Sequence, residues 1–114
     1  MWFSIVYKFT MDVLEVKYFG TLFVQATLPI HNCDAYWGNV YYEQWNQRIR
    51  QSYAGRLFDL AYWESVNAAG QRTYDPDGAP CIHPDWAIFS DAHVNEQGAD
   101  WLGEHLLAVL ASLP

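Results

Sequence analysis

The chain is short of basic residues. Six lysines and arginines stand against thirteen aspartates and glutamates in 114 residues, which gives a formal net charge of -7. Nucleic acids and anionic membranes are bound largely by lysine and arginine side chains that neutralise phosphates. We therefore expect neither nucleic acid nor an anionic membrane surface among the partners of this protein.

The sequence also lacks a long apolar run. A helix that spans a membrane needs about 20 consecutive apolar residues, and no segment approaches that length. The opening segment MWFSIVYKFT has neither the basic start nor the small-residue cleavage site of a secretory signal. The sequence as written therefore predicts no membrane span and no export signal.

Cysteine is scarce as well. Cys33 and Cys81 are the only two, too few for a disulfide scaffold, and they do not identify a cellular compartment. They can pair or stay buried and free. With His31 and His83 they also offer the ligand set of a structural zinc site, but their spacing is not that of common zinc sites. We expect ordinary loop and core residues here, with no metal and no cofactor.

Apolar and aromatic residues are abundant instead. They make up 52% and 18% of the chain, which is typical of a folded protein rather than a disordered one. The length allows one domain at most. Some aromatic residues form a group that either belongs to the core or binds sugars or partner proteins. The members of this group are Tyr36, Trp37, Tyr41, Tyr42 and Trp45.

The middle of the chain follows a strand, helix, strand pattern. Residues 21–27 form a short apolar run typical of a strand buried in a parallel sheet. Apolar residues at helical spacing predict a helix over about 36–54, with Gly55 as its C-cap. A second apolar strand over 56–61 completes a right-handed crossover.

The two ends of the chain complete an α/β pattern. Residues 1–20 have no clean period and predict a strand or a short helix that ends at Gly20. Residues 64–90 are rich in proline, glycine and aspartate and predict a loop. Asn95 is a good N-cap for a terminal helix. An apolar stripe on that helix comprises Ala99, Leu102, Leu106, Val109 and Leu113. Since two buried strands are too few for a stable sheet, further strands must be supplied from elsewhere.

An acid and a histidine lie just before this helix. Asp91 and His93 are separated by one residue in a loop, and loops held by a rigid scaffold often carry catalytic groups. A carboxylate can orient the imidazole while the second ring nitrogen takes a proton from a hydroxyl nucleophile. The alternative is a solvated loop pair in which Asp91 or Asn95 only caps the helix.

Three segments resemble SGNH hydrolases, also called GDSL-like esterases. SDAHVNEQGADWLGEHLLAVL resembles their last block, in which Asp-x-x-His is followed by Asn, Gly and a terminal amphipathic helix. LFVQATLP resembles the strand that ends in their Thr-x-x-Pro turn, and Asn46 and Ile49-Arg50 match the helix after it. LFDLAYWES resembles a sub-group that reads Leu-Phe-Asp-Ile-Ala and then Glu-Ser.

The resemblance covers residues 21–113 and implies a three-layer α/β/α, flavodoxin-like fold that hydrolyses esters of small alcohols, lipids or carbohydrates. It makes His93 the general base and Asp91 the acid that orients it. In the family the acid lies three residues before the histidine, where this chain has Ser90. Either Asp91 takes the role, or a deletion of one residue has shifted the loop.

The serine block of the family is missing. None of the serines follows Gly-Asp, and no Gly-x-Asn-Asp block supplies an oxyanion hole. We therefore expect residues 21–114 to be the C-terminal part of an SGNH-like domain, preceded by an atypical segment over 1–20. Such a chain is inactive alone, and the expected partner of the complete enzyme is a small-molecule ester.

A second hypothesis belongs to a different class of function. In it the chain is a non-catalytic α/β module that binds a partner or a carbohydrate through the aromatic group. Exposed apolar side chains would also favour self-association.

Overall fold

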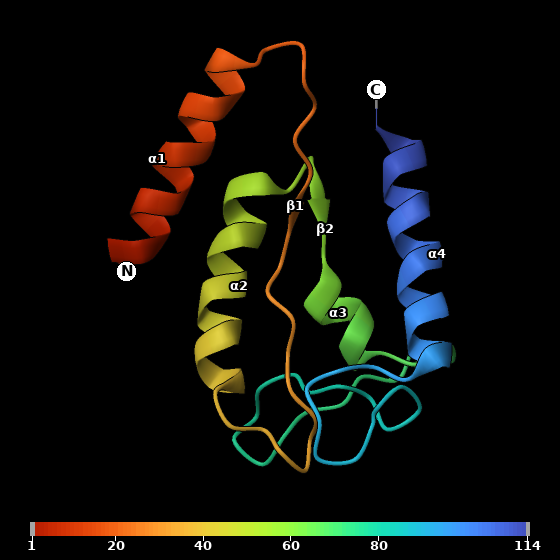
Figure 1. Ribbon diagram of the computed structural model, residues 1–114. Coiled ribbons are helices and arrows are strands. Elements are labelled where there is room, and N and C mark those ends of the chain that lie inside the picture. The colour runs from red at the N-terminus through yellow and green to blue at the C-terminus, as the bar shows by residue number, and fades with distance from the viewer. Residues whose placement is uncertain (1, 114) are drawn as a thin grey trace.

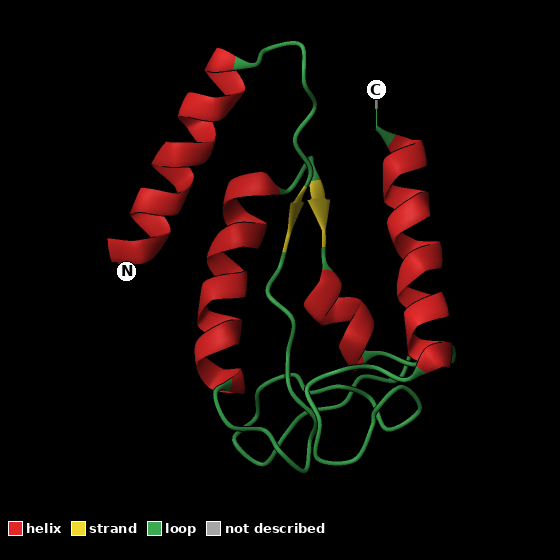
Figure 2. Ribbon diagram, viewed as in Figure 1, coloured by secondary structure: helices red, strands yellow, loops and turns green. Residues whose placement is uncertain are grey.

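A computed structural model describes residues 2–113, with side chains from residue 5 onward. Its elements are α1 (Trp2–Lys17), β1 (Gln25–Ala26), α2 (Asn39–Tyr53), β2 (Leu57–Phe58), α3 (Leu60–Ser65) and α4 (Glu96–Ser112). β1 and β2 are parallel, and Gln25 pairs with Leu57. Figure 2 shows the strand pair among the helices. The predicted mixed α/β class and parallel pairing are confirmed.

The helices and loops take separate places around the strand pair (Figure 1). α2 lies on one side of the strands and α4 on the other, while α1 packs against α2. Both strands run toward a layer of loops at one end of the molecule, and α4 starts from that layer. In α/β proteins, ligand sites gather beyond the carboxyl ends of parallel strands. A functional site is therefore expected in the loop layer.

Two buried asparagines of α2 hold the segment that follows β1. Asn46 Oδ1 accepts the Leu28 N–H at 2.7 Å, and Asn46 Nδ2 donates to the Leu28 carbonyl at 3.1 Å. Asn39 makes the same pair of bonds with His31, at 2.7 and 3.3 Å. These amides replace a neighbouring strand as hydrogen-bond partners of an extended backbone. β1 is therefore shorter than the predicted strand 21–27.

Asp59 ends β2. Its Oδ1 accepts the Tyr62 N–H at 3.3 Å as the N-cap of α3, and its Oδ2 accepts from Arg50 Nε at 2.7 Å. A capping carboxylate starts a helix by satisfying a backbone N–H that has no partner within that helix. The predicted strand 56–61 is therefore wrong in its second half, which belongs to α3.

Three other predicted boundaries also change. Residues 1–20 contain a 16-residue helix, α1, that ends at Lys17 rather than at Gly20. Gly55 is not the C-cap of α2, because Ala54 takes that position in right-handed helical conformation. The predicted loop 64–90 includes the last residues of α3.

The start of α4 agrees with the prediction. Asn95 Oδ1 accepts the Gly98 N–H at 2.8 Å as the N-cap. A Cβ atom on Gly98 would lie 2.9 Å from the Cβ atoms of Trp86 and Val94, so only glycine fits this close approach. The cap and the glycine fix the loop before α4 against the core.

α4 packs through rings more than through its predicted apolar stripe. His105 stacks on Trp63 of α3 with ring centroids 3.5 Å apart, and Trp101 stacks on Trp86 at 5.3 Å. Within the stripe, Leu102 is half-buried but Leu106 is exposed. Much apolar surface thus remains uncovered on this helix. No helix within residues 2–113 is long and apolar enough to cross a membrane.

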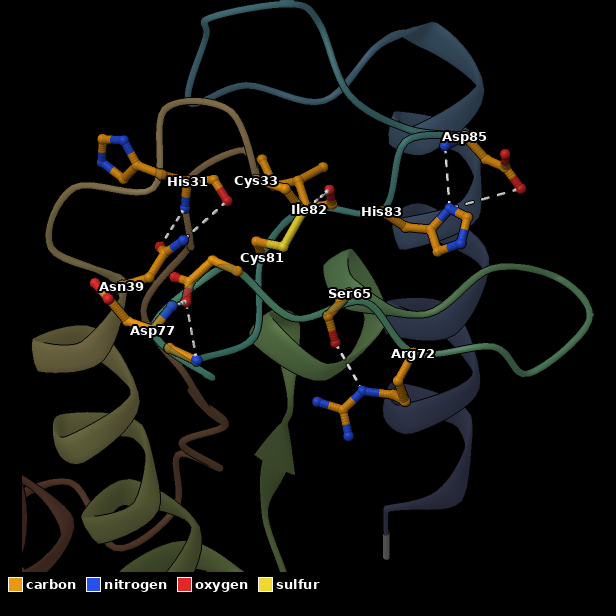
Figure 3. The surroundings of a disulfide bond; sticks show 12 residues. His31, Cys33, Asn39, Ser65, Arg72, Asp77, Cys81, Ile82, His83 and Asp85 are labelled. Atoms are coloured by element: carbon orange, nitrogen blue, oxygen red, sulfur yellow. Dashed lines mark hydrogen bonds and ion pairs between the residues drawn. A yellow bond between two sulfur atoms is a disulfide. The ribbon is translucent and has the colours of Figure 1, made fainter.

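A disulfide between Cys33 and Cys81 ties the segment after β1 to the loop that follows α3 (Figure 3). Cys81 is fully buried, beside the core residue Ile82. Because both sulfurs are bonded to each other, they are not available as zinc ligands. The alternative of a zinc site with His31 and His83 is therefore wrong.

Candidate functional site

Asp91 and His93 meet in the loop before α4. Asp91 Oδ1 lies 2.6 Å from His93 Nδ1 and also accepts the His93 backbone N–H at 2.9 Å. The His93 side chain is 83% exposed. A proton held on Nδ1 by the carboxylate leaves Nε2 as the ring atom that can accept a proton. The pair therefore has the local geometry of an oriented general base.

A hollow borders this pair in the loop layer. Its volume is about 230 Å³, and Ala92, between the two residues of the pair, forms part of its wall. The rest of the wall comes from the segment after β1, including Ile30 and His31, and from Tyr42 of α2. Neither Asp91 nor His93 lines the hollow itself. The pair thus lies at the rim of a space large enough for a small group.

The backbone just before Asp91 is constrained. Ser90 has φ 55°, in the left-handed region that residues other than glycine seldom adopt. Asp34 Oδ2 accepts from the Ser90 N–H at 3.0 Å and from its hydroxyl at 3.2 Å. Ser90 stands where SGNH hydrolases carry their acid, but it faces Asp34. The acid that contacts His93 is Asp91.

The contact with His93 changes the acidity of Asp91. The hydrogen bond from the His93 ring, and then that from its backbone N–H, lower the pKa of Asp91 below its ordinary value. Both bonds favour the charged carboxylate, which is the form that can stabilise a protonated imidazole.

We expect His93→Ala to raise the pKa of Asp91 toward its ordinary value. The ring bond is the larger cause of the lowering, and it disappears with the imidazole, whereas the backbone bond remains. Carbon-detected NMR titration of the aspartate carboxyl groups measures the change. His83→Ala, which removes a different histidine, should leave Asp91 unchanged. An Asp91 titration that is identical in the protein with and without His93 would contradict the contact.

A second histidine and aspartate pair lacks this arrangement. His83 Nδ1 accepts the Asp85 backbone N–H at 3.0 Å, and the Asp85 carboxylate is farther away, at 3.6 Å (Figure 3). The His83 side chain is only 12% exposed. Its Nδ1 is occupied as an acceptor, so no carboxylate orients the ring as a base. His83 has a structural role and serves as a control for His93.

The serine hydroxyls that make hydrogen bonds do so with groups other than His93. The Ser65 hydroxyl is buried and accepts from Arg72 Nε at 2.9 Å (Figure 3). The Ser90 hydroxyl donates to Asp34, and that of Ser112 to a carbonyl of α4. Among residues 5–113, no hydrogen bond joins a serine to His93.

The predicted aromatic group divides into two. Tyr42 stacks on His31 at 5.6 Å, and Trp45 contacts Tyr7 of α1 at 6.1 Å. Trp37 and Tyr41 are 81% and 73% exposed. α1, which covers Trp45, was not predicted to lie there. The surface available to a ligand is therefore smaller than the sequence indicated.

Glu64 is a buried acid that the sequence did not identify as a site residue, although it belongs to the segment LFDLAYWES. It is 4% exposed, and its Oε2 accepts the Ile30 N–H at 2.9 Å beneath the hollow. Burial raises the pKa of Glu64 to about 7. No periodic or local pattern identifies it, since its burial follows from the packing of α3 against the segment after β1.

The function of this chain is inferred from the geometry of the site, because comparison with known proteins found no match. No family model, no curated protein and no solved structure matches this chain.

Proposed function

We propose that this chain is the histidine-bearing part of an SGNH-type ester hydrolase. One observation carries the proposal: the carboxylate of Asp91 lies 2.6 Å from Nδ1 of an imidazole that is otherwise 83% exposed. The loop before α4, which carries the pair, also lies beyond the carboxyl ends of the two parallel strands, and its Ala92 lines a hollow. This is the position that α/β enzymes use for catalytic groups.

In the proposed reaction, His93 acts first as a base and then as an acid. Nε2 takes the proton of a serine hydroxyl from a Gly-Asp-Ser block, and the serine oxygen attacks the carbonyl carbon of the ester. The imidazolium then gives that proton to the leaving alcohol, and water hydrolyses the acyl-enzyme by the same route. Asp91 stabilises the imidazolium and holds the ring in place.

We propose that the strand pair belongs to a larger sheet, which forms the middle layer of a three-layer α/β/α fold. Gln25 and Thr27 donate their N–H groups to the β2 side, so the backbone of Ala26 faces the other edge of β1. An apolar hollow of about 380 Å³ also runs between the strands and α4, with Phe58 and Leu106 in its wall. We propose that the serine-bearing strands pair with β1 and cover this apolar surface.

The proposal is tested by expressing this chain together with the sequence that is encoded upstream of it. We expect the DNA upstream of the first codon to encode a Gly-Asp-Ser block, in frame or after a frameshift. Protein expressed from the restored reading frame should hydrolyse short-chain nitrophenyl esters, whereas the 114-residue chain alone should not. His93→Ala should abolish this hydrolysis.

His83→Ala is the matched control, because it removes a histidine whose ring is not oriented by a carboxylate. Hydrolysis should survive this change. An upstream region without such a block in any frame would contradict the proposal, as would equal activity with and without His93. Turnover by the 114-residue chain alone that depends on His93 would instead show that its nucleophile lies within the chain.

A further inference from the structure

A second hollow lies at the first turn of α2, and it shares no lining residue with the hollow beside Ala92. Its volume is about 420 Å³, and its lining combines aromatic rings with two polar side chains. We refer to it as the aromatic hollow, and its relevant residues are Tyr36, Trp37, Tyr41, Gln44 and Asp77. It is independent of the proposed ester hydrolysis, because it shares no residue with the Asp91 and His93 pair.

Two rings of this hollow are largely open to solvent. Trp37 is 81% exposed and Tyr41 is 73% exposed. Neither ring contacts another aromatic ring among the described residues. Large exposed apolar surface of this kind commonly marks a binding site. We refer to these two exposed rings as the platform; at this exposure they do not enclose a ligand.

The two polar side chains of the hollow are free to bind a ligand. The carboxylate of Asp77 and the amide of Gln44 make no hydrogen bond or ion pair within the described part of the chain. A carboxylate accepts hydrogen bonds, and an amide both donates and accepts them. Together they match a ligand that carries several hydroxyl groups.

A rigid turn presents Asp77 to the platform. Asp75 Oδ1 accepts the N–H groups of Asp77 and Ala79 at 2.9 and 3.0 Å, and Gly78 has φ 85°. The disulfide at Cys81 fixes the chain just beyond this turn. Asp77 lines the hollow together with Val40 and Tyr41 of the first turn of α2. A site that is fixed before binding loses less entropy when the ligand arrives.

We infer that the aromatic hollow binds a neutral carbohydrate. The apolar faces of sugar rings stack on Trp37 and Tyr41, and the sugar hydroxyls bond to Asp77 and Gln44. An organic cation would be held best by rings that enclose it, whereas these rings form an open platform. The net charge of -7 disfavours a polyanionic ligand.

The experiment uses the full chain and soluble neutral polysaccharides. Xylan, mixed-linkage glucan, galactomannan and oligomers of N-acetylglucosamine are tested by affinity electrophoresis and tryptophan fluorescence. We expect at least one of them to retard the protein. Trp37→Ala and Tyr41→Ala should each weaken that binding about ten-fold or more, because each removes one stacking face. The matched control is Phe19→Ala, which removes an aromatic ring that is 93% exposed outside the hollow.

The Asp77→Asn variant distinguishes a sugar-binding site from a cation-binding site. The asparagine keeps a hydrogen-bonding oxygen, so sugar binding should fall only a few-fold, whereas the binding of tetramethylammonium to a cation site should disappear. The inference is overturned if no polysaccharide in the panel binds or if Phe19→Ala weakens binding as much as Trp37→Ala. It is also overturned if tetramethylammonium binds instead of sugar. Self-association that depends on Trp37, without sugar binding, would likewise overturn it.

Discussion

Replacement of both half-cystines, Cys33→Ala with Cys81→Ala, is expected to lower the free energy of unfolding by about 4 kcal/mol. The disulfide joins residues 48 positions apart, so its loss restores much conformational freedom to the unfolded chain. A domain is stabilised by only about 5–15 kcal/mol in total. The loss is therefore a large share, and urea unfolding followed by tryptophan fluorescence measures it.

Reduction provides the control for this substitution. A reducing agent should shift the unfolding midpoint of the unchanged protein toward that of the double variant, and it should leave the variant itself unaffected. Thiol titration of the unfolded, unreduced protein should find no free cysteine. If the protein and the double variant unfold at the same urea concentration under oxidising conditions, the disulfide does not contribute as we expect.

The sequence left the pairing of these cysteines open because the contact that brings them together is distant along the chain. A parallel bridge between Asn32 and Ile82 places the neighbouring Cys33 and Cys81 side by side. Neither residue of that bridge has a pattern that predicts its partner. Spacing alone therefore allowed a disulfide, two free thiols or a metal site.

The types of α2, α4, β1 and β2 could be predicted, whereas α1 was left open between a strand and a helix and α3 was not predicted. Apolar spacing identified α2 and α4, and the short apolar runs identified β1 and β2. The ends of the strands depend on single side chains, namely Asn46 after β1 and Asp59 after β2. These residues act on backbone groups that are near in space, so their effect appears only once the elements have packed.

The parts of the candidate site also differ in whether the sequence could predict them. Asp91 and His93 are two positions apart, so local sequence was enough to predict that they can meet. The aromatic group needed tertiary information, because the packing of Tyr7 on Trp45 removes one member from the surface. Asp77 joins the remaining rings from a turn far along the chain. A contact between residues that are close in the sequence can thus be predicted, whereas a surface assembled from distant segments cannot.

Glu64 is expected to make a contribution to the free energy of unfolding that falls as the pH rises from 4.5 to about 7. Burial raises the pKa of this carboxyl from 4.5 to about 7, and the hydrogen bond from Ile30 opposes the rise only in part. Above pH 4.5 the unfolded chain releases the Glu64 proton, while the folded protein keeps it until about pH 7. Ionisation therefore favours unfolding across this range, by about 3 kcal/mol when it is complete.

Glu64→Gln tests this prediction because a glutamine keeps an oxygen for the Ile30 N–H but cannot ionise. The variant should gain stability relative to the unchanged protein as the pH rises from 4.5 to about 7, and urea unfolding at each pH measures the difference. Burial also lowers the pKa of His105, so that protonation of this ring destabilises the fold as the pH falls below 6.5. His105 is present in both proteins, so its effect cancels in the difference. A Glu64→Gln profile parallel to that of the unchanged protein would show that Glu64 is not the group responsible.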